Sequence, residues 1–80
     1  MNYHYAKHGN EVGAYNICAY VRMADYFRNY TIVKEYLKPY KKVIGATPNC
    51  YRYRNKYYYI DVVCINGRPS GEIVSFGARN

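Results

Sequence analysis

The 80-residue chain has room for one domain, residues 1–80, with a modest hydrophobic core. Twelve Lys and Arg residues against five Asp and Glu give a formal net charge of +7, so we expect attraction to polyanions such as nucleic acid. No apolar run is long enough for a membrane span, no secretory signal opens the chain, and three cysteines without a CxxC pair do not form a disulfide framework. We therefore expect a cytoplasmic protein with reduced thiols.

The first ten residues are polar and carry two tyrosines and two histidines. Tyr3 and Tyr5 fit a short strand or a tail that docks through its rings. His4 and His8 have the HxxxH spacing of a zinc-binding pair, but no close pair of cysteines accompanies them. We interpret them as surface histidines and expect neither a bound metal nor another cofactor.

Residues 13–23 fit two structures. Apolar residues alternate with more polar ones along the stretch: Tyr15, Ile17, Ala19, Val21 and Met23. Other residues recur at helical spacing: Ala14, Cys18, Val21 and Ala24. Periodicity alone does not separate a strand from a helix in so short a run, and we favour the strand.

Residues 24–38 give the clearest helical pattern. The apolar stripe recurs at spacings of three and four: Tyr26, Tyr30, Val33, Leu37 and then Tyr40, with Phe27 beside it. Asp25 fits an N-cap or a first-turn acid, and Pro39 is expected to end the helix at Lys38. A break at residues 29–31, with Thr31 as a second cap, would instead give two short helices.

Aromatic and β-branched residues dominate residues 51–65, which we predict to be a β-hairpin. With a two-residue turn at Asn55 and Lys56, Tyr53 lies opposite Tyr58. Because side chains alternate across a strand, one face is the predicted core face: Tyr51, Tyr53, Tyr58, Ile60, Val62 and Cys64. The other face is predicted to be exposed: Arg52, Arg54, Tyr57, Tyr59 and Asp61.

Residues 72–76 read as a further strand, and a bulge decides whether Ile73 or Val74 joins Phe76 in the core. The fold class is therefore predicted to be α+β. We expect a small antiparallel sheet of three to four strands with one helix packed on one face. The helix stripe would meet the core face of the hairpin.

The Arg/Tyr face of the hairpin is the leading candidate for function. Arginines bind phosphates bidentately, and tyrosine rings stack on bases, so alternating them on one sheet face suits RNA or single-stranded DNA. Lysines near the expected helix end would extend a phosphate track. The candidate binding residues are Arg52, Arg54, Tyr57, Tyr59, Lys38, Lys41 and Lys42.

Catalysis finds little support, because no paired carboxylates, nucleophile elbow or phosphate loop is visible. The only acids are Glu11, Asp25, Glu35, Asp61 and Glu72. We therefore predict a non-enzymatic binding protein.

The segments YRYRNKYYYIDVVCI and GEIVSFGAR, within residues 51–79, resemble the C-terminal sheet of RelE/ParE-type toxins. That sheet is often written as R-x-R, a turn, Y-x-x-x-Y, a loop and a strand ending in G-H-R, and Ala78 stands where the family often has His. The resemblance implies an RNA-cleaving toxin, with four residues at its site: Arg52, Arg54, Tyr58 and Arg79.

Small, basic, tyrosine-rich chains also resemble viral or phage accessory proteins, including inhibitors of host defence nucleases of the anti-CRISPR kind. Such a protein would act in the host cytoplasm by binding an acidic or nucleic-acid-binding protein, with its tyrosines as interface anchors. Thirteen tyrosines exceed what a core of this size hides, so a homodimer is a further possibility. Composition does not separate these interpretations from nucleic-acid binding.

Overall fold

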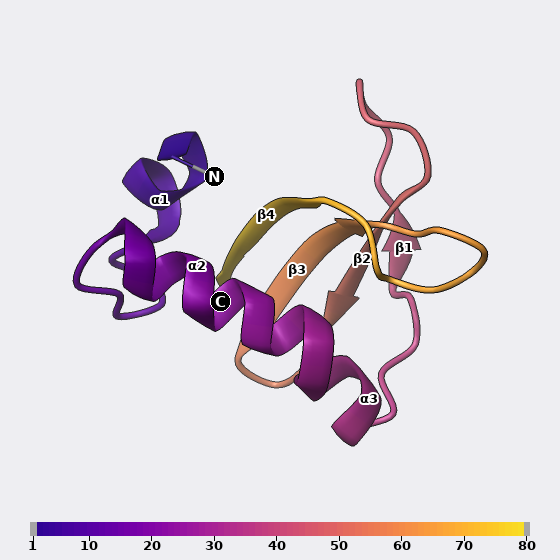
Figure 1. The fold of residues 1–80 in the computed structure, drawn as a ribbon, viewed down its shortest axis with the longest axis horizontal. Helices are drawn as coiled ribbons and strands as arrows, with labels where there is room; N and C mark the ends of the chain where they lie inside the picture. Colours follow the sequence, from indigo (N-terminus) through magenta and orange to yellow (C-terminus); the bar gives the residue numbers. More distant parts are fainter. Residues whose placement is uncertain (1, 80) are drawn as a thin grey trace.

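The structure is a computed structural model that describes residues 2–79, with side chains from residue 5 onwards. After the short helix α1 (Asn2–His8), 18 residues form one helical stretch that lies across one face of a sheet (Figure 1). Its three parts are α2 (Ile17–Tyr26), the π-helical turn η1 (Phe27–Thr31) and α3 (Ile32–Lys34).

Four antiparallel strands follow in the order β1-β2-β3-β4. Their bounds are β1 (Lys41–Lys42), β2 (Cys50–Arg54), β3 (Tyr58–Val63) and β4 (Ile73–Ala78). The predicted α+β fold, with three to four strands and one helix on one face, is confirmed. Two elements were not predicted: the two-residue strand β1, and α1, which takes the place of the strand or tail that we expected near Tyr5.

Residues 13–23 were expected to form a strand, and this was wrong, because they turn and then enter α2. Asn16 caps the helix: its Oδ1 accepts a hydrogen bond from the backbone N–H of Ala19 at 2.9 Å. The buried residues of α2 are Tyr20 and Ala24, which are four positions apart. Helical spacing therefore decides which side chains meet the core, whereas the alternation had placed the buried Tyr20 among the more polar residues.

The predicted core stripe of the helix was also wrong, because Tyr26, Tyr30 and Val33 are 55%, 61% and 72% exposed. The buried positions of the helix are Tyr20, Ala24, Phe27, Thr31 and Ile32. The π-helical turn accounts for part of this difference. The N–H of Ile32 bonds to the Phe27 carbonyl five residues back, which adds one residue to the turn and brings Ile32 rather than Val33 to the sheet.

Two expectations about caps within the helix also fail. Asp25 is not an N-cap, because it lies inside α2 and its Oδ1 is 3.8 Å from Nη2 of Arg28. The helix does not break at residues 29–31, and Thr31 is a buried residue of η1 that makes no side-chain cap bond.

The helix ends at Lys34, four residues before the expected end at Lys38. Tyr36 adopts a positive φ of 55°, and the N–H of Leu37 bonds to the Ile32 carbonyl at 2.9 Å. These two features form a Schellman cap, which satisfies the last carbonyls and reverses the chain before the proline is reached. Leu37 still packs against the core, as predicted.

The β2–β3 hairpin is confirmed, with its turn displaced by one residue. The N–H of Asn55 donates to the Tyr58 carbonyl at 3.0 Å, and its Oδ1 accepts from the N–H groups of Tyr57 and Tyr58, both at 2.9 Å. The centre of the turn is therefore Lys56 and Tyr57. An asparagine side chain can imitate the backbone at the start of a turn, which explains why Asn55 stands before the centre and not in it.

This displacement shifts the partners across the hairpin by two residues. The residues of β2 and β3 nevertheless stay on their predicted faces of the sheet. Tyr53 lies opposite Ile60, and Arg52 lies opposite Asp61. Because side chains alternate, a shift of two keeps every strand residue on its predicted face. The core face is confirmed: Tyr53, Ile60 and Val62 are buried, and Tyr51, Tyr58 and Cys64 pack against them.

A bulge in β4 settles the arrangement of the last strand. Pairing with β3 jumps from Ser75 to Ile73, which leaves Val74 as the extra residue. Ile73 and Phe76 are both buried as a result. The Tyr20 hydroxyl donates to the Phe76 carbonyl at 2.6 Å and so ties the helix to β4. Burial raises the pKa of Tyr20 to about 12.

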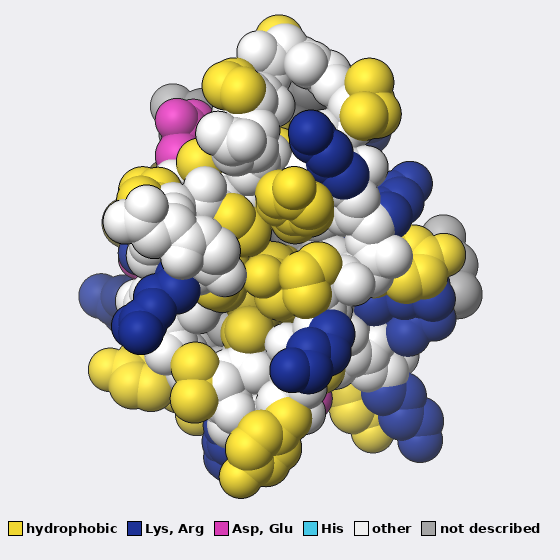
Figure 2. All heavy atoms as spheres, turned by 90° about the vertical axis from the view of Figure 1, so that its right-hand side faces the viewer, with side chains coloured by type: hydrophobic (Ala, Val, Ile, Leu, Met, Phe, Trp, Pro, Cys, Tyr) yellow, Lys and Arg dark blue, Asp and Glu magenta, His cyan; other side chains and the backbone are white. Residues whose placement is uncertain are grey.

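The loops at residues 43–49 and 64–72 extend from the side of the sheet away from α1 (Figure 1). Figure 2 looks onto this side, where hydrophobic side chains gather in the middle and Lys and Arg side chains lie around them. Ile44 and Ile65 belong to these loops and are largely exposed. The exposed apolar surface of the chain is therefore not limited to its tyrosines.

Candidate nucleic-acid interface

The sheet face that points away from the helix carries a cavity of about 230 Å³. It is lined by Tyr40, Arg52, Arg54, Tyr59, Ala78 and Arg79, which we call the arginine pocket. Alternation along β2 places Arg52 and Arg54 here because Tyr53 between them faces the core. Lys41 lies opposite Arg52 in the β1–β2 ladder and adds a further cation to this face.

Arg52 is joined to Asp61 by two hydrogen bonds. Its Nε donates to Oδ1 at 2.7 Å, and its Nη2 donates to Oδ2 at 2.9 Å. This bonding raises the pKa of Arg52, and the Asp61 side chain is only 6% exposed. Asp61 was expected on an exposed face, and it is instead a buried counter-charge. Asp61 therefore neutralises the charge of Arg52 from beneath the pocket without lining the cavity.

The Tyr59 ring is held between a glycine and a guanidinium. It lies opposite Gly77, where an added Cβ would come within 2.8 Å of the ring Cε1. The Arg52 Cζ lies 4.2 Å from the ring centroid, a cation–π distance. The hydroxyl is 3.4 Å from both Ser75 Oγ and His8 Nε2. Tyr59 therefore supports Arg52 in its place.

Arg54 and Arg79 differ from Arg52 because neither forms an ion pair with a carboxylate within residues 5–79. The Arg54 Cζ lies 3.4 Å from the centroid of the Tyr40 ring. Arg79 Nη1 donates to the Asn55 carbonyl at 2.7 Å. Two guanidinium groups are thus oriented by neutral partners and have no carboxylate partner among residues 5–79.

The other predicted binding residues do not all share this face. Tyr57 stands in the hairpin turn and lies towards the helix, away from the pocket. By alternation along β1, Lys41 is on the face of the pocket and Lys42 is on the face of the helix. Lys38 is exposed in the connection after the helix. The cluster that the structure brings together is therefore smaller than the predicted one.

Three residues of the pocket, Tyr40, Ala78 and Arg79, were not among the binding residues predicted from the sequence pattern. Tyr40 was assigned to the end of the helix stripe, and only the pairing of residues 41–42 with β2 would have placed it beside Arg54. Arg79 was indicated only by the resemblance to toxins. Of the residues named by that resemblance, Tyr58 lies on the core face and is not in the pocket.

No group of three or more metal-binding side chains occurs within the residues whose side chains are described, 5–79. His8 Nδ1 lies 3.1 Å from Glu11 Oε1, and the side chain of His4 lies outside the described residues. The cysteines are unpaired: Cys18 is exposed, Cys50 is buried and Cys64 is half-buried. Burial raises the pKa of the Cys50 thiol.

Within the described residues, no helix has the length and apolarity needed to cross a membrane. No family model, curated protein or solved structure matches the chain.

Proposed function

We propose that the protein binds single-stranded nucleic acid in the arginine pocket and does not act as an enzyme. The observation that carries this proposal is the convergence of Arg54 and Arg79 on one small cavity, with no carboxylate partner for either guanidinium within residues 5–79. Phosphate oxygens are the ligands that such forks bind best. The net charge of +7 would draw a polyanion to this face.

A single strand suits the pocket better than a duplex. Arg54 rests on Tyr40 and Arg52 rests on Tyr59, so each guanidinium has one face on a ring and can present the other to an unstacked base. Bases that are paired in a helix do not expose such faces. Among the residues whose side chains are described, no carboxylate or histidine lines the cavity, which supports binding over acid–base chemistry.

The test is a titration of labelled single-stranded RNA and DNA at two salt concentrations. We expect affinity to fall steeply with salt, and Arg54→Ala combined with Arg79→Ala to reduce the logarithmic salt slope by about 1.4, at about 0.7 per phosphate contact. Each single substitution should weaken binding by roughly tenfold. Lys34→Ala is the matched control, because it removes an exposed cation from the end of the helix and not from the pocket.

Equal losses in the control and in the arginine variants would contradict the proposal, because binding would then follow total charge and not the pocket. A lack of binding at low salt would contradict it as well. Sustained cleavage of RNA, abolished by Arg52→Ala or Arg54→Ala, would overturn the non-enzymatic part and favour the toxin-like alternative.

A further inference from the structure

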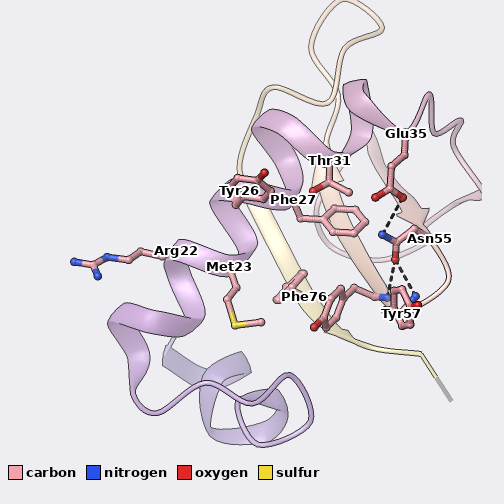
Figure 3. A pocket seen from close by; sticks show the side chains of 10 residues that line it. Arg22, Met23, Tyr26, Phe27, Thr31, Glu35, Asn55, Tyr57 and Phe76 are labelled. Atoms are coloured by element: carbon pink, nitrogen blue, oxygen red, sulfur yellow. Dashed lines mark hydrogen bonds between the residues drawn. The ribbon is translucent and has the colours of Figure 1, made fainter.

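On the helix side of the sheet, an open groove of about 440 Å³ runs between the helix and the hairpin turn. Its lining is mainly aromatic and apolar: Met23, Tyr26, Phe27, Tyr57, Tyr58 and Phe76, with Arg22, Thr31, Glu35 and Asn55 as its polar members. Figure 3 shows Met23, Phe27 and Phe76 directed into it from the helix and from β4. We call it the aromatic groove.

The floor and the rims of the groove differ in exposure. Phe27 and Phe76 form a buried floor, whereas the Tyr26 and Tyr57 rings at the sides are 55% and 63% exposed. Large aromatic rings beside an open apolar cavity are the usual anchors of protein interfaces.

One end of the groove is fixed by hydrogen bonds. Asn55 Nδ2 donates to Glu35 Oε1 at 3.1 Å, while Asn55 Oδ1 holds the N–H groups of Tyr57 and Tyr58 (Figure 3). Glu35 is the only acid in the lining, and its carboxylate is engaged in this bond. A preformed site of this kind loses little conformational entropy when it is filled.

The charges around the groove are mostly positive. Arg22 projects outward at the end opposite Glu35 (Figure 3), and the Lys56 Nζ lies 5.8 Å from the centroid of the Tyr57 ring. A second copy of the chain would bring its own net charge of +7 to this rim. An acidic partner would be attracted to the rim, and a second copy would be repelled.

We propose that the aromatic groove docks an acidic segment of a partner protein, which inserts one large apolar side chain between Tyr26 and Tyr57. The groove has room for a tryptophan, phenylalanine or leucine side chain, and Asp or Glu beside this anchor would meet Arg22 and Lys56. This site lies on the opposite face of the sheet from the arginine pocket. It shares no lining residue with that pocket and gives the protein a second kind of partner.

The experiment is a selection from a displayed library of random peptides on the immobilised wild-type protein, followed by titration of the best peptides. We expect the enriched peptides to share one large apolar residue flanked by Asp or Glu. The double variant Tyr26→Ala, Tyr57→Ala should lose at least about tenfold in affinity, and both changes are at exposed rings.

Two further variants distinguish peptide binding in the groove from nonspecific binding to the protein surface. Arg22→Glu is at an exposed position and should shift the preference from acidic to basic flanks, because it reverses the charge at one end. Tyr15→Ala removes a ring that is 94% exposed and outside the groove, so it should leave the affinity unchanged.

Three outcomes would overturn the proposal. The first is the absence of enriched peptides, or equal enrichment on the double variant. The second is a concentration-dependent shift of the Met23 methyl NMR signal in the protein alone, which would assign the groove to a second copy. The third is a shift of that signal by single-stranded RNA, with the peptides competing for the same site, which would assign the groove to nucleic acid.

Discussion

The arginine pocket and the aromatic groove lie on opposite faces of one sheet, and both use tyrosine, but they use it differently. In the pocket, Tyr40 and Tyr59 carry guanidinium groups on their rings. In the groove, Tyr26 and Tyr57 lie beside Met23 and buried phenylalanines, and their rings pack against the rings of Tyr30 and Tyr58. The neighbours of a tyrosine, and not the number of tyrosines, decide whether the surface suits phosphates and bases or an apolar anchor.

The difference between Tyr57 and Tyr59 shows that a change of one element along the chain decides which of the two surfaces a tyrosine belongs to. Two residues separated by one position on a strand would share a face. Because Tyr57 stands in the turn and Tyr59 in β3, the first lines the groove and the second lines the pocket. The two partner classes that composition left indistinguishable are thus proposed for separate surfaces.

The largest effect that we expect is a loss of folding stability at alkaline pH, which arises in the core that both surfaces share. Burial raises the pKa of both Tyr20 and Tyr53 to about 12, against 10 for an exposed tyrosine. Below pH 10 both states keep these protons, and the stabilisation is complete. Between pH 10 and 12 only the unfolded state releases them, so stability falls as pH rises through this window. Urea unfolding at a series of alkaline pH values measures it.

Tyr20→Phe is the control for alkaline unfolding, because it removes one of the two hydroxyls and should flatten the dependence on pH. Identical pH profiles for the wild type and this variant would contradict the prediction that the raised pKa of Tyr20 contributes to the loss of stability at alkaline pH.

The next largest effect should distinguish the two surfaces, because it should weaken RNA binding in the arginine pocket but not peptide binding in the aromatic groove. Gly77→Ala places a Cβ against the Tyr59 ring, so the ring must move and Arg52 with it. We expect a loss of stability of about 1–3 kcal/mol, as for overpacked sites, together with weaker binding of RNA. Peptide binding in the groove should not change. Urea unfolding and the two titrations measure these three quantities.

Gly45→Ala is the matched control for this glycine, because no heavy atom lies within 4 Å of the added Cβ. If the two alanine variants behave alike, the contact between Tyr59 and Gly77 has no part in the arginine pocket.

The smallest effect is expected at Tyr57. Tyr57→Ala removes an exposed ring and leaves the backbone N–H that Asn55 holds, so stability should change by no more than about 0.5 kcal/mol. RNA affinity should stay within about twofold, whereas Tyr59→Ala should weaken it clearly. If Tyr57→Ala and Tyr59→Ala reduced RNA affinity equally, both rings would have to belong to one RNA-binding surface, which would contradict the separation of the groove from the pocket.

The hairpin was the part of the fold that the sequence predicted best, for a physical reason. A strand has a period of two, so the error of two residues in the register left Arg52, Arg54 and Tyr59 on their predicted face. The error did hide the pairing of Arg52 with Asp61. From the sequence, Asp61 was an exposed acid, and only the true register identifies it as a buried counter-charge.

The helix was predicted less well, because its side chains were judged by hydropathy alone. Tyr26, Tyr30 and Val33 make a regular stripe, yet the core selects Phe27 and Ile32 after the π-helical turn. A turn of this kind leaves no pattern in a single sequence. The groove was missed for the same reason, since its tyrosine rims had been assigned to the core or to the hairpin face.

One further consequence follows from how the sheet begins and ends. Its first strand, β1, consists of two exposed lysines, and its last strand, β4, is flanked by α1 (Figure 1). Strands rich in aromatic residues tend to add further strands along an open edge and grow into fibrils. A very short, charged edge at one side and a helix at the other oppose such growth. The chain can therefore display many aromatic rings on its surface while its backbone offers little template for aggregation.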